Sequence, residues 1–189
     1  MKIRESGMPE EKLWDQFFDI ELILSELQIN SDVQDIAEIG CGYGTFTIPA
    51  SKTISGKLFS FDIEVEMLAT VKNKIDNKKI ENIFLQQRDV LTQTTGLQEN
   101  SIDYLMLFNI LHHDTPNELL NEAYRILKPR GRIGIIHWRS DIETPRGPDL
   151  SIRPTPEHIT QWIEPDKFTI EKKGFILPPF HFGMLLLKN

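Results

Sequence analysis

The sequence predicts an α/β fold in which helices cover both faces of a doubly wound, mostly parallel sheet. Short stretches of β-branched and apolar residues alternate with longer amphipathic stretches along the chain. Residues 35–46 join a buried strand to a helix through a glycine-rich turn, and the next two expected strands each end in an acid, Asp62 and Asp89. This alternation is typical of strand–helix–strand units, whose strands run parallel.

Length and composition limit the possible classes of protein. The chain has 189 residues, 40% of them hydrophobic, which predicts one domain over 1–189, with an N-terminal segment at 1–30 and a core at 31–189. The net charge of −7 and the lack of a basic run weigh against nucleic acid as a partner. Because Cys41 is the only cysteine, we expect no intrachain disulfide and a cytoplasmic location. Neither a signal region nor a membrane span is expected.

Residues 9–28 have the spacing of an amphipathic helix, with apolar residues recurring every three or four positions. Trp14 and Phe18 form a second, adjacent aromatic row. We therefore predict a helix packed across the sheet. In an alternative interpretation, Trp14 or Phe18 also closes the active site.

The stretch from Val33 to Ile39 predicts a covered strand, and three glycines at alternate positions follow it, Gly40, Gly42 and Gly44. A strand, a glycine turn and a helix N-terminus together form a cradle for a nucleotide or cofactor, because free backbone N–H groups point outward there. In the dinucleotide fingerprint G-x-G-x-x-G, the last glycine would fall at position 45, which is Thr45 here.

Acidic residues at two expected strand ends are candidate ligand contacts. Asp62 lies 22 residues after Gly40, at the end of the strand beginning at Lys57, and is placed to accept hydrogen bonds from ribose hydroxyls. Alternatively, it caps the helix expected over 64–76. Asp89 ends the strand expected over 82–90, where a surface turn is the alternative role.

A fourth strand over 101–109 ends at Asn109, which we expect at the same sheet edge as the glycine turn. His112, His113 and Asp114 follow, but adjacent side chains point in different directions and do not easily converge on one metal ion. We therefore predict no metal site.

The segment from Thr115 to Glu118 has capping-box spacing and predicts the start of a helix that runs to Leu127, with residues 91–100 before the fourth strand as a loop. A fifth strand over 132–138 brings His137 to the cofactor edge.

Residues 140–156, rich in proline and charge, predict a long loop over this edge, and a short helix through Ile163 follows. Arg139, Arg146 and Arg153 could bind an anionic acceptor there, although solvated arginines are the ordinary outcome. The stretches 168–175 and 181–187 predict two final strands joined as an antiparallel hairpin.

The pattern E-x-G-x-G-x-G that starts at Glu38, together with the turn 127–131, resembles class I S-adenosylmethionine (SAM)-dependent methyltransferases. The similarity is to the broad group that includes the ubiquinone- and menaquinone-biosynthesis-type enzymes. It implies a seven-stranded sheet with an antiparallel C-terminal edge hairpin, and SAM as cofactor. The cofactor-binding residues that it implies or that their position favours are Glu38, Gly40, Cys41, Gly42, Gly44, Asp62, Ile63, Asp89, Val90 and Asn109.

The expected reaction is in-line methyl transfer from SAM to a small-molecule acceptor, with positioning as the main contribution of the protein. His137 is the first candidate for a general base, His113 the second, and His181 has less support. A non-catalytic SAM-binding protein is one alternative. A nicotinamide-dependent oxidoreductase is another, disfavoured by Thr45 and by the lack of a Tyr-x-x-x-Lys pair. The oligomeric state stays open.

Overall fold

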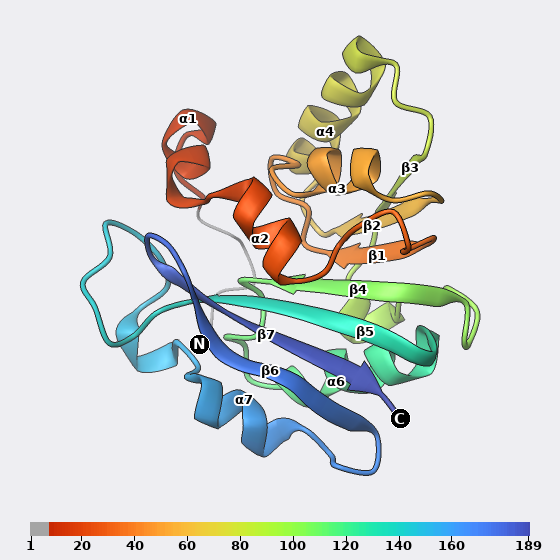
Figure 1. Cartoon of the computed structure of the whole chain (residues 1–189). Coiled ribbons are helices and arrows are strands. Elements are labelled where there is room, and N and C mark those ends of the chain that lie inside the picture. Colours follow the sequence, from red (N-terminus) through yellow and green to blue (C-terminus); the bar gives the residue numbers. More distant parts are fainter. Residues whose placement is uncertain (1–7) are drawn as a thin grey trace.

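Seven strands form one sheet in the order β3-β2-β1-β4-β5-β7-β6 in the computed structural model, which describes residues 8–189 (Figure 1). Strands β1 to β5 are mutually parallel, whereas β7 is antiparallel to both β5 and β6. This confirms the doubly wound sheet and the antiparallel edge hairpin. The strands are β1 (Ile36–Ile39), β2 (Leu58–Asp62), β3 (Ile83–Gln87), β4 (Ile102–Phe108), β5 (Leu127–Trp138), β6 (Phe168–Leu177) and β7 (His181–Lys188).

Helices cover both faces of this sheet. The α-helices are α1 (Glu11–Trp14), α2 (Ile20–Glu26), α3 (Thr47–Thr53), α4 (Val65–Lys78), α5 (Val90–Gln93), α6 (Pro116–Ile126) and α7 (Pro156–Trp162), and the short 3-10 turns are η1 (Asp15–Phe17) and η2 (Leu150–Ile152). Helices α2, α3 and α4 lie on one face, and α6 and α7 lie on the other (Figure 1).

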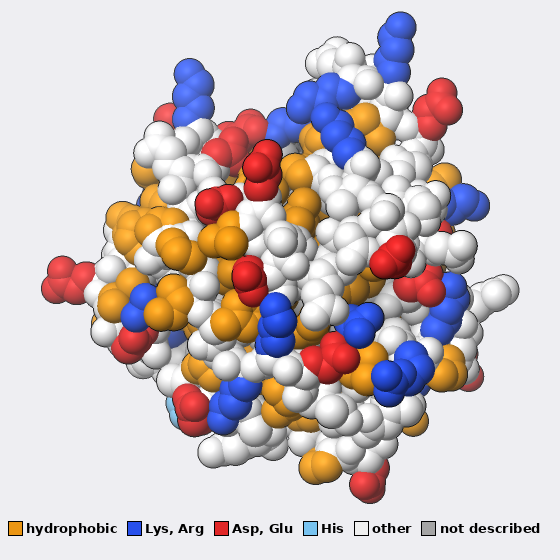
Figure 2. All heavy atoms as spheres, viewed as in Figure 1, with side chains coloured by type: hydrophobic (Ala, Val, Ile, Leu, Met, Phe, Trp, Pro, Cys, Tyr) orange, Lys and Arg blue, Asp and Glu red, His pale blue; other side chains and the backbone are white. Residues whose placement is uncertain are grey.

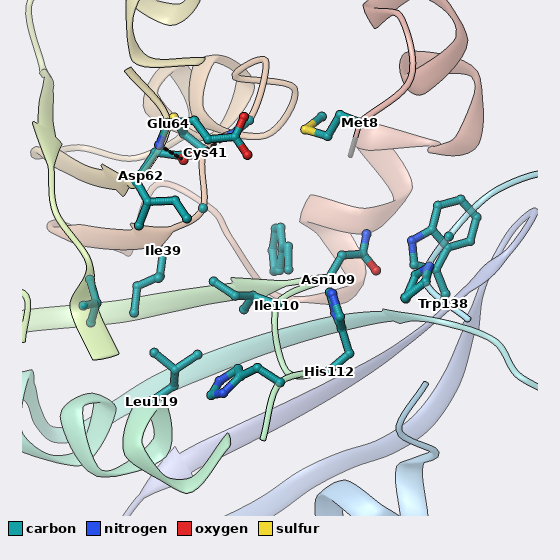
Figure 3. A pocket seen from close by; sticks show the side chains of 18 of the residues that line it. Met8, Ile39, Cys41, Asp62, Glu64, Asn109, Ile110, His112, Leu119 and Trp138 are labelled. Atoms are coloured by element: carbon teal, nitrogen blue, oxygen red, sulfur yellow. Dashed lines mark hydrogen bonds between the residues drawn. The ribbon is translucent and has the colours of Figure 1, made fainter. Parts of the chain in front are cut away.

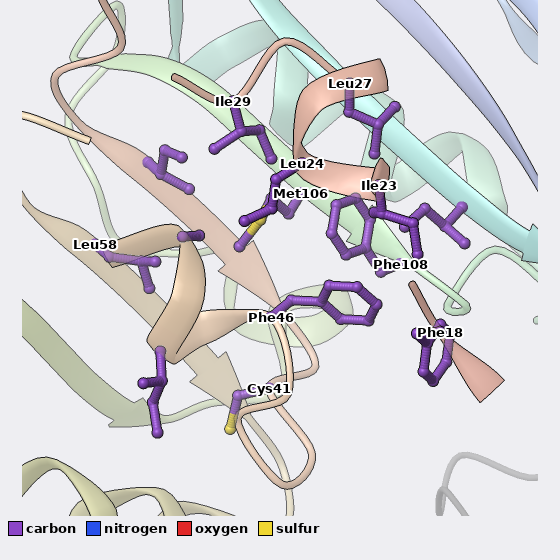
Figure 4. Close-up of a cluster of buried hydrophobic side chains, with 14 of the residues drawn as sticks. Phe18, Ile23, Leu24, Leu27, Ile29, Cys41, Phe46, Leu58, Met106 and Phe108 are labelled. Carbon is purple, nitrogen blue, oxygen red and sulfur yellow. The ribbon is translucent and has the colours of Figure 1, made fainter. Parts of the chain in front are cut away.

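Neighbouring residues of the central strand β4 pack into the cores on opposite faces of the sheet, because successive side chains of a strand point to opposite faces. Met106 and Phe108 belong to the core under α2 and α3, and Leu105 and Leu107 belong to the core under α6. Figure 4 shows the first of these cores. All seven residues of β4 except Asp103 are buried, as expected for a strand covered on both sides.

The single helix predicted over residues 9–28 is wrong, since the segment breaks into α1, η1 and α2. The backbone of Phe18 is extended, with φ −137°, and forms an isolated antiparallel bridge with Pro179. Asp19 then starts a new helix, because its Oδ1 accepts a hydrogen bond from the Leu22 N–H at 3.1 Å. Tertiary contact with the end of the hairpin therefore overrides the helical spacing.

Two smaller predictions also need correction. Thr115 makes no side-chain hydrogen bond to α6, so the expected capping box is absent, although Pro116 does occupy the first turn. Strand β5 begins at Leu127 rather than at 132, and it pairs with β4 through a register shift between Ile102 and Tyr104. The expected loop at 91–100 begins with the end of α5.

No helix among residues 8–189 is long and apolar enough to cross a membrane.

Candidate active site

A cavity of about 690 Å³ opens at the carboxyl ends of β1, β2 and β4 (Figure 3). Ligands bind at this edge of open α/β sheets, where the strand order reverses. The backbone turn after β1 forms part of its lining, with φ +84° at Gly40 and +49° at Gly42. Both values are in the left-handed region that glycine adopts without a steric penalty.

Asp62, at the end of β2, lies directly beside this turn. Its Oδ2 accepts a hydrogen bond from the Gly42 N–H at 3.0 Å, and its Oδ1 accepts one from the Glu64 N–H at 2.9 Å. A carboxylate oxygen has two lone-pair sites, so each oxygen keeps the capacity to accept a further hydrogen from a ligand. The same carboxylate therefore fixes the glycine turn and lines the cavity.

Five further predicted cofactor residues lie in the lining, namely Cys41, Ile63, Asp89, Val90 and Asn109. Burial raises the pKa of the Cys41 thiol far above its ordinary value, which keeps it protonated and poorly nucleophilic. Asp89 caps α5, since its Oδ1 accepts a hydrogen bond from the Leu91 N–H at 3.1 Å. The cavity thus combines an apolar section, built from Ile63 and Val90, with a rim that accepts hydrogen bonds.

Asn109 follows β4 with a positive φ of +56°, which is uncommon for a residue other than glycine and typical of functional sites. Its Nδ2 donates to the Nε2 of His181 at 3.3 Å, and its buried Oδ1 accepts no hydrogen bond from the described part of the chain. Burial lowers the pKa of His181 to about 3, so this imidazole stays neutral and can accept. The contact with His181 therefore fixes the orientation of the Asn109 side chain at the edge of the cavity.

Glu38 does not line the cavity, contrary to its predicted contact with the cofactor. Its side chain is 3% exposed, beneath the glycine turn, and its Oε2 accepts hydrogen bonds from Thr47 at 2.6 Å and Ser60 at 2.7 Å. Burial raises the pKa of Glu38 to about 7 despite these two hydrogen bonds. The carboxyl group thus joins α3 to β2 under the site.

Gly44 also lies outside the lining, again contrary to the prediction of cofactor contact. Its φ is +77°, and a Cβ there would come within 3.1 Å of Val71 in α4. The third glycine of the motif therefore allows the turn to pack against α4.

Because of this packing, Gly44→Ala should lower the free energy of unfolding by about 1–2 kcal/mol, the usual cost of a left-handed backbone with a Cβ. The affinity of the folded protein for SAM should change less than threefold. Urea denaturation and calorimetry would measure the two quantities. A loss of affinity without a loss of stability would instead indicate that Gly44 contacts the cofactor.

The two predicted general bases lie in different places. His113 belongs to the cavity lining, and its Nδ1 accepts a hydrogen bond from the Thr115 N–H at 3.1 Å. His137 is fully buried below the cavity and is not part of its lining, so its predicted direct role at the cofactor edge needs correction. Its Nε2 instead faces the Nδ1 of His112 at 3.4 Å. Desolvation by burial lowers its pKa well below the ordinary value.

Several aromatic side chains line the cavity, and Figure 3 shows one of them, Trp138, on the side away from Asp62. Trp14, Phe46, Phe108 and Trp138 all line it. The rings of Trp14 and Trp138 lie 6.3 Å apart, and those of Phe46 and Phe108 lie 4.9 Å apart. Trp14 therefore lines the cavity, and its closing of the site stays a prediction.

Phe18, the other aromatic residue considered for closing the site, is not part of the lining. Its ring stacks on the imidazole of His181 at a centroid distance of 4.5 Å and packs in the core.

The three arginines considered for an anionic acceptor have different roles. Arg139 pairs with Asp141 at 2.8 Å. Arg153 is 8% exposed and donates to the carbonyl oxygens of Arg139, Arg146 and Pro148, which ties down the loop over the cavity. Only the exposed Arg146 lines the cavity.

Sequence reasoning did not assign several lining residues to the site, namely Met8, Pro9, Thr45, Glu64, Arg88 and His112. The loop predicted over 140–156 does contribute to the lining, through residues 147–152 apart from Leu150. Met8 lies so close to the turn that a Cβ at Gly42 would meet its Sδ at 2.9 Å. Flexible or irregular segments carry no periodic pattern, and nothing in the pattern distinguishes His112 from His113. The described residues contain no group of three or more His, Cys, Asp or Glu side chains that could hold a metal ion.

Known proteins resemble both the sequence and this fold. Residues 36–131 match a family model described as a methyltransferase domain. A demethylmenaquinone methyltransferase from Lactobacillus johnsonii is 29% identical over 103 residues, which is 52% of this chain and 41% of that protein. A ubiquinone/menaquinone biosynthesis C-methyltransferase from Rickettsia typhi is 30% identical over 120 residues, covering 59% of this chain and 46% of that protein. The chain therefore matches less than half of the length of these curated relatives.

Solved structures extend the likeness to most of the chain. A SAM-dependent methyltransferase from Aquifex aeolicus has a TM-score of 0.82 at 20% identity and covers 94% of this chain and 96% of its own. A provisionally assigned type 11 methyltransferase from Sulfolobus solfataricus has a TM-score of 0.71 at 30% identity, with 89% and 90% covered. With the glycine turn and Asp62 at one cavity, these matches show that the chain belongs to the class I SAM-dependent methyltransferases.

Proposed function

We propose that the chain transfers the methyl group of SAM to a small-molecule acceptor by in-line displacement. The observation that carries this proposal is the division of one cavity into two parts. A polar part holds Asp62, Asp89 and the glycine turn, and an aromatic part is lined by side chains such as Trp14 and Trp138. A volume of about 690 Å³ is in the range of small-ligand sites.

The residues fit SAM, which is the cofactor of this family. We place the ribose at Asp62 and the adenine between Ile63, Val90 and Asp89. Asn109 lines the same cavity, beside the glycine turn. SAM supplies an activated methyl group on its sulfonium. The protein then contributes alignment and the exclusion of water, worth about 7–11 kcal/mol in well-oriented reactions.

We further propose that residues 1–189 work as one catalytic unit, with segment 1–30 as a lid over the site. Contacts support this at the described end of that segment. Tyr43 donates to the carbonyl of Pro9 at 2.9 Å, Thr45 donates to Asp15 at 2.9 Å, and Lys74 pairs with Glu11. Residues 1–7 lie outside the described part of the chain.

The nature of the acceptor and the compartment are also inferences. Lys and Arg side chains alternate with Asp and Glu over the face in Figure 2, without the basic surface that phosphate backbones require. This favours a small acceptor over nucleic acid. The lone Cys41 supports the cytoplasm as its location.

Calorimetry with SAM, S-adenosylhomocysteine and NAD would test the cofactor assignment, and release of S-adenosylhomocysteine with a panel of small acceptors would test turnover. We expect binding of the first two and none of NAD. Binding of SAM without turnover of any acceptor would favour the non-catalytic alternative, and binding of NAD alone would favour an oxidoreductase.

Asp62→Ala should weaken SAM binding by at least tenfold, because a hydrogen bond to a charged group contributes about 1.5–3 kcal/mol. Loss of the contact with Gly42 should add to the effect. Calorimetry would measure it, with the exposed Asp166→Ala as the matched control. Unchanged affinity in Asp62→Ala would contradict the ribose assignment.

A further inference from the structure

A buried histidine at the start of β7 contacts three parts of the chain that meet beside the cavity. His181 is fully buried and is not itself part of the cavity lining. Its Nε2 is hydrogen-bonded to the side-chain amide of Asn109, which follows β4, at 3.3 Å. Its ring lies 4.2 Å from that of Trp138 in β5 and stacks on Phe18 of the N-terminal segment at 4.5 Å. Asn109 and Trp138 line the cavity, so His181 connects the N-terminal segment to two lining residues (Figure 3).

The contacts of His181 constrain its ring in different directions. Phe18 is nearly parallel to the imidazole, with an interplanar angle of 27°, so it packs against a face of the ring. The hydrogen bond with Asn109 instead involves a nitrogen at the ring edge. Displacement of Phe18 would therefore free the imidazole to tilt. The hydrogen bond with Asn109 would then lose its geometry, because hydrogen bonds weaken steeply with misalignment.

The imidazole of His181 suits this contact because it stays neutral. Burial lowers its pKa to about 3, and the positive charge of Arg153 acts in the same direction, whereas the backbone of Phe17 opposes the change. A neutral imidazole has one nitrogen that can accept from the Asn109 amide, while an imidazolium has donors only. The ring therefore transmits a position rather than a charge.

Only the side chain of Asn109 depends on this contact, because its backbone is held separately. The backbone N–H donates to the carbonyl oxygen of Ile136 in β5 at 2.8 Å. The left-handed φ of +56° then fixes where the side chain begins. Loss of the contact with His181 should therefore release the amide group of Asn109 without moving the end of β4.

The N-terminal segment is docked beside the same imidazole. Phe18 forms an isolated antiparallel bridge with Pro179, and Phe17 packs against Trp138 with ring centroids 5.5 Å apart. Trp14, which lines the cavity, contacts the ring of Phe18 at 5.0 Å. The position of the segment over the cavity and the orientation of the imidazole are thus set by the same group of side chains.

Building on the proposed function, we propose that His181 is a positioning residue that couples the docking of the N-terminal segment to the binding of SAM, and that it acts through Asn109. While Phe18 packs against the imidazole, the Asn109 amide keeps its orientation at the cavity. When Phe18 leaves, this orientation is lost and the affinity for SAM falls. Because coupling between two equilibria is reciprocal, bound SAM in turn holds the segment in place.

The hydrogen bond is tested with two replacements of similar size. His181→Phe keeps an aromatic ring for Phe18 but cannot accept a hydrogen bond, whereas His181→Gln offers an amide oxygen to Asn109. By calorimetry, His181→Phe should weaken SAM binding by about three- to tenfold, as expected for one ordinary hydrogen bond, and His181→Gln should recover most of this loss. The exposed His158→Gln is the matched control. A His181→Gln variant that binds SAM no better than His181→Phe would overturn the proposal.

The coupling is measured with a double-mutant cycle. Phe18→Leu should weaken SAM binding by about threefold or more, although Phe18 does not line the cavity. In an Asn109→Gly background, which tolerates the left-handed backbone, the same change should have almost no further effect. Phe18 also contacts Trp14 and Phe46, which line the cavity, and an effect that passes through them would persist in Asn109→Gly. Additive losses would therefore contradict the role of His181, even if His181→Phe itself does not fold.

The reverse direction is measured by limited trypsin digestion of the full chain, read by mass spectrometry. Lys12 is exposed in α1 and provides a cleavage site within the N-terminal segment. Saturating SAM should slow cleavage after Lys12 by about threefold or more in the wild type, and should have little effect on it in His181→Phe. Equal protection in both proteins would overturn this inference alone, whereas failure of the wild type to bind SAM would overturn the proposed function with it.

Discussion

Between pH 5 and pH 8, the free energy of unfolding of the wild type is expected to fall by roughly 2–3 kcal/mol more than that of Glu38→Gln. In the folded protein the pKa of Glu38 is raised from 4.5 to about 7, chiefly by burial. Each pKa unit corresponds to 1.36 kcal/mol. The folded state therefore binds a proton that the unfolded state has already lost, so stability decreases as the pH rises through this window.

Gln is the matched replacement because its side-chain oxygen can accept the same hydrogen bonds from Thr47 and Ser60. Urea denaturation at several pH values, read by circular dichroism, would give both curves. Parallel curves for the two proteins would show that Glu38 is ionised in the folded state near pH 5. Burial of an ionised carboxylate below the glycine turn would then need an explanation.

Arg153→Met is expected to lower the free energy of unfolding by at least 2 kcal/mol and to release the loop over the cavity. The guanidinium donates to three carbonyl oxygens at 2.8–3.2 Å and lies over the Trp138 ring, with its Cζ 5.8 Å from the ring centroid. Each hydrogen bond from a charged donor contributes about 1.5–3 kcal/mol, and water replaces part of that contribution in the variant. Met has an apolar side chain of similar length, so the loss of stability can be attributed to the guanidinium group.

Limited proteolysis within residues 140–152 would detect release of the loop, and Arg153→Lys is the matched control. A lysine cannot reproduce the planar fork, so we expect an intermediate result rather than recovery. If Arg153→Met were as resistant to cleavage as the wild type, the loop would be held by other contacts. In that case KM for the acceptor should not change either.

The part of the site that we assign to the cofactor could be predicted, because the residues that form it are recognisable from their neighbours in the sequence. Gly40 and Gly42 are fixed by backbone geometry, and Asp62 follows a strand at a spacing that the parallel topology imposes. The acceptor half depends on which residues meet across strands. The sequence predicts His137 at a strand end, yet it pairs with Phe182 of β7 and contacts His112, and neither relation has a local pattern.

The same contrast explains the other errors. The helical spacing around Phe18 was real, but a bridge to Pro179 formed instead. Glu38 and Gly44 were expected at the cofactor because they share a motif with residues that line the cavity. A motif records which residue types occur together, whereas side-chain direction decides that one faces α3 and the other α4.

The insertion of β7 between β5 and β6 has a consequence for biosynthesis. All eight residues of β7 are buried, and the strand supplies His181, which orients Asn109. The cofactor half of the sheet, from β3 to β4, leaves the ribosome much earlier. Because His181 orients Asn109, the site reaches its final arrangement only after β7 has left the ribosome and paired with β5.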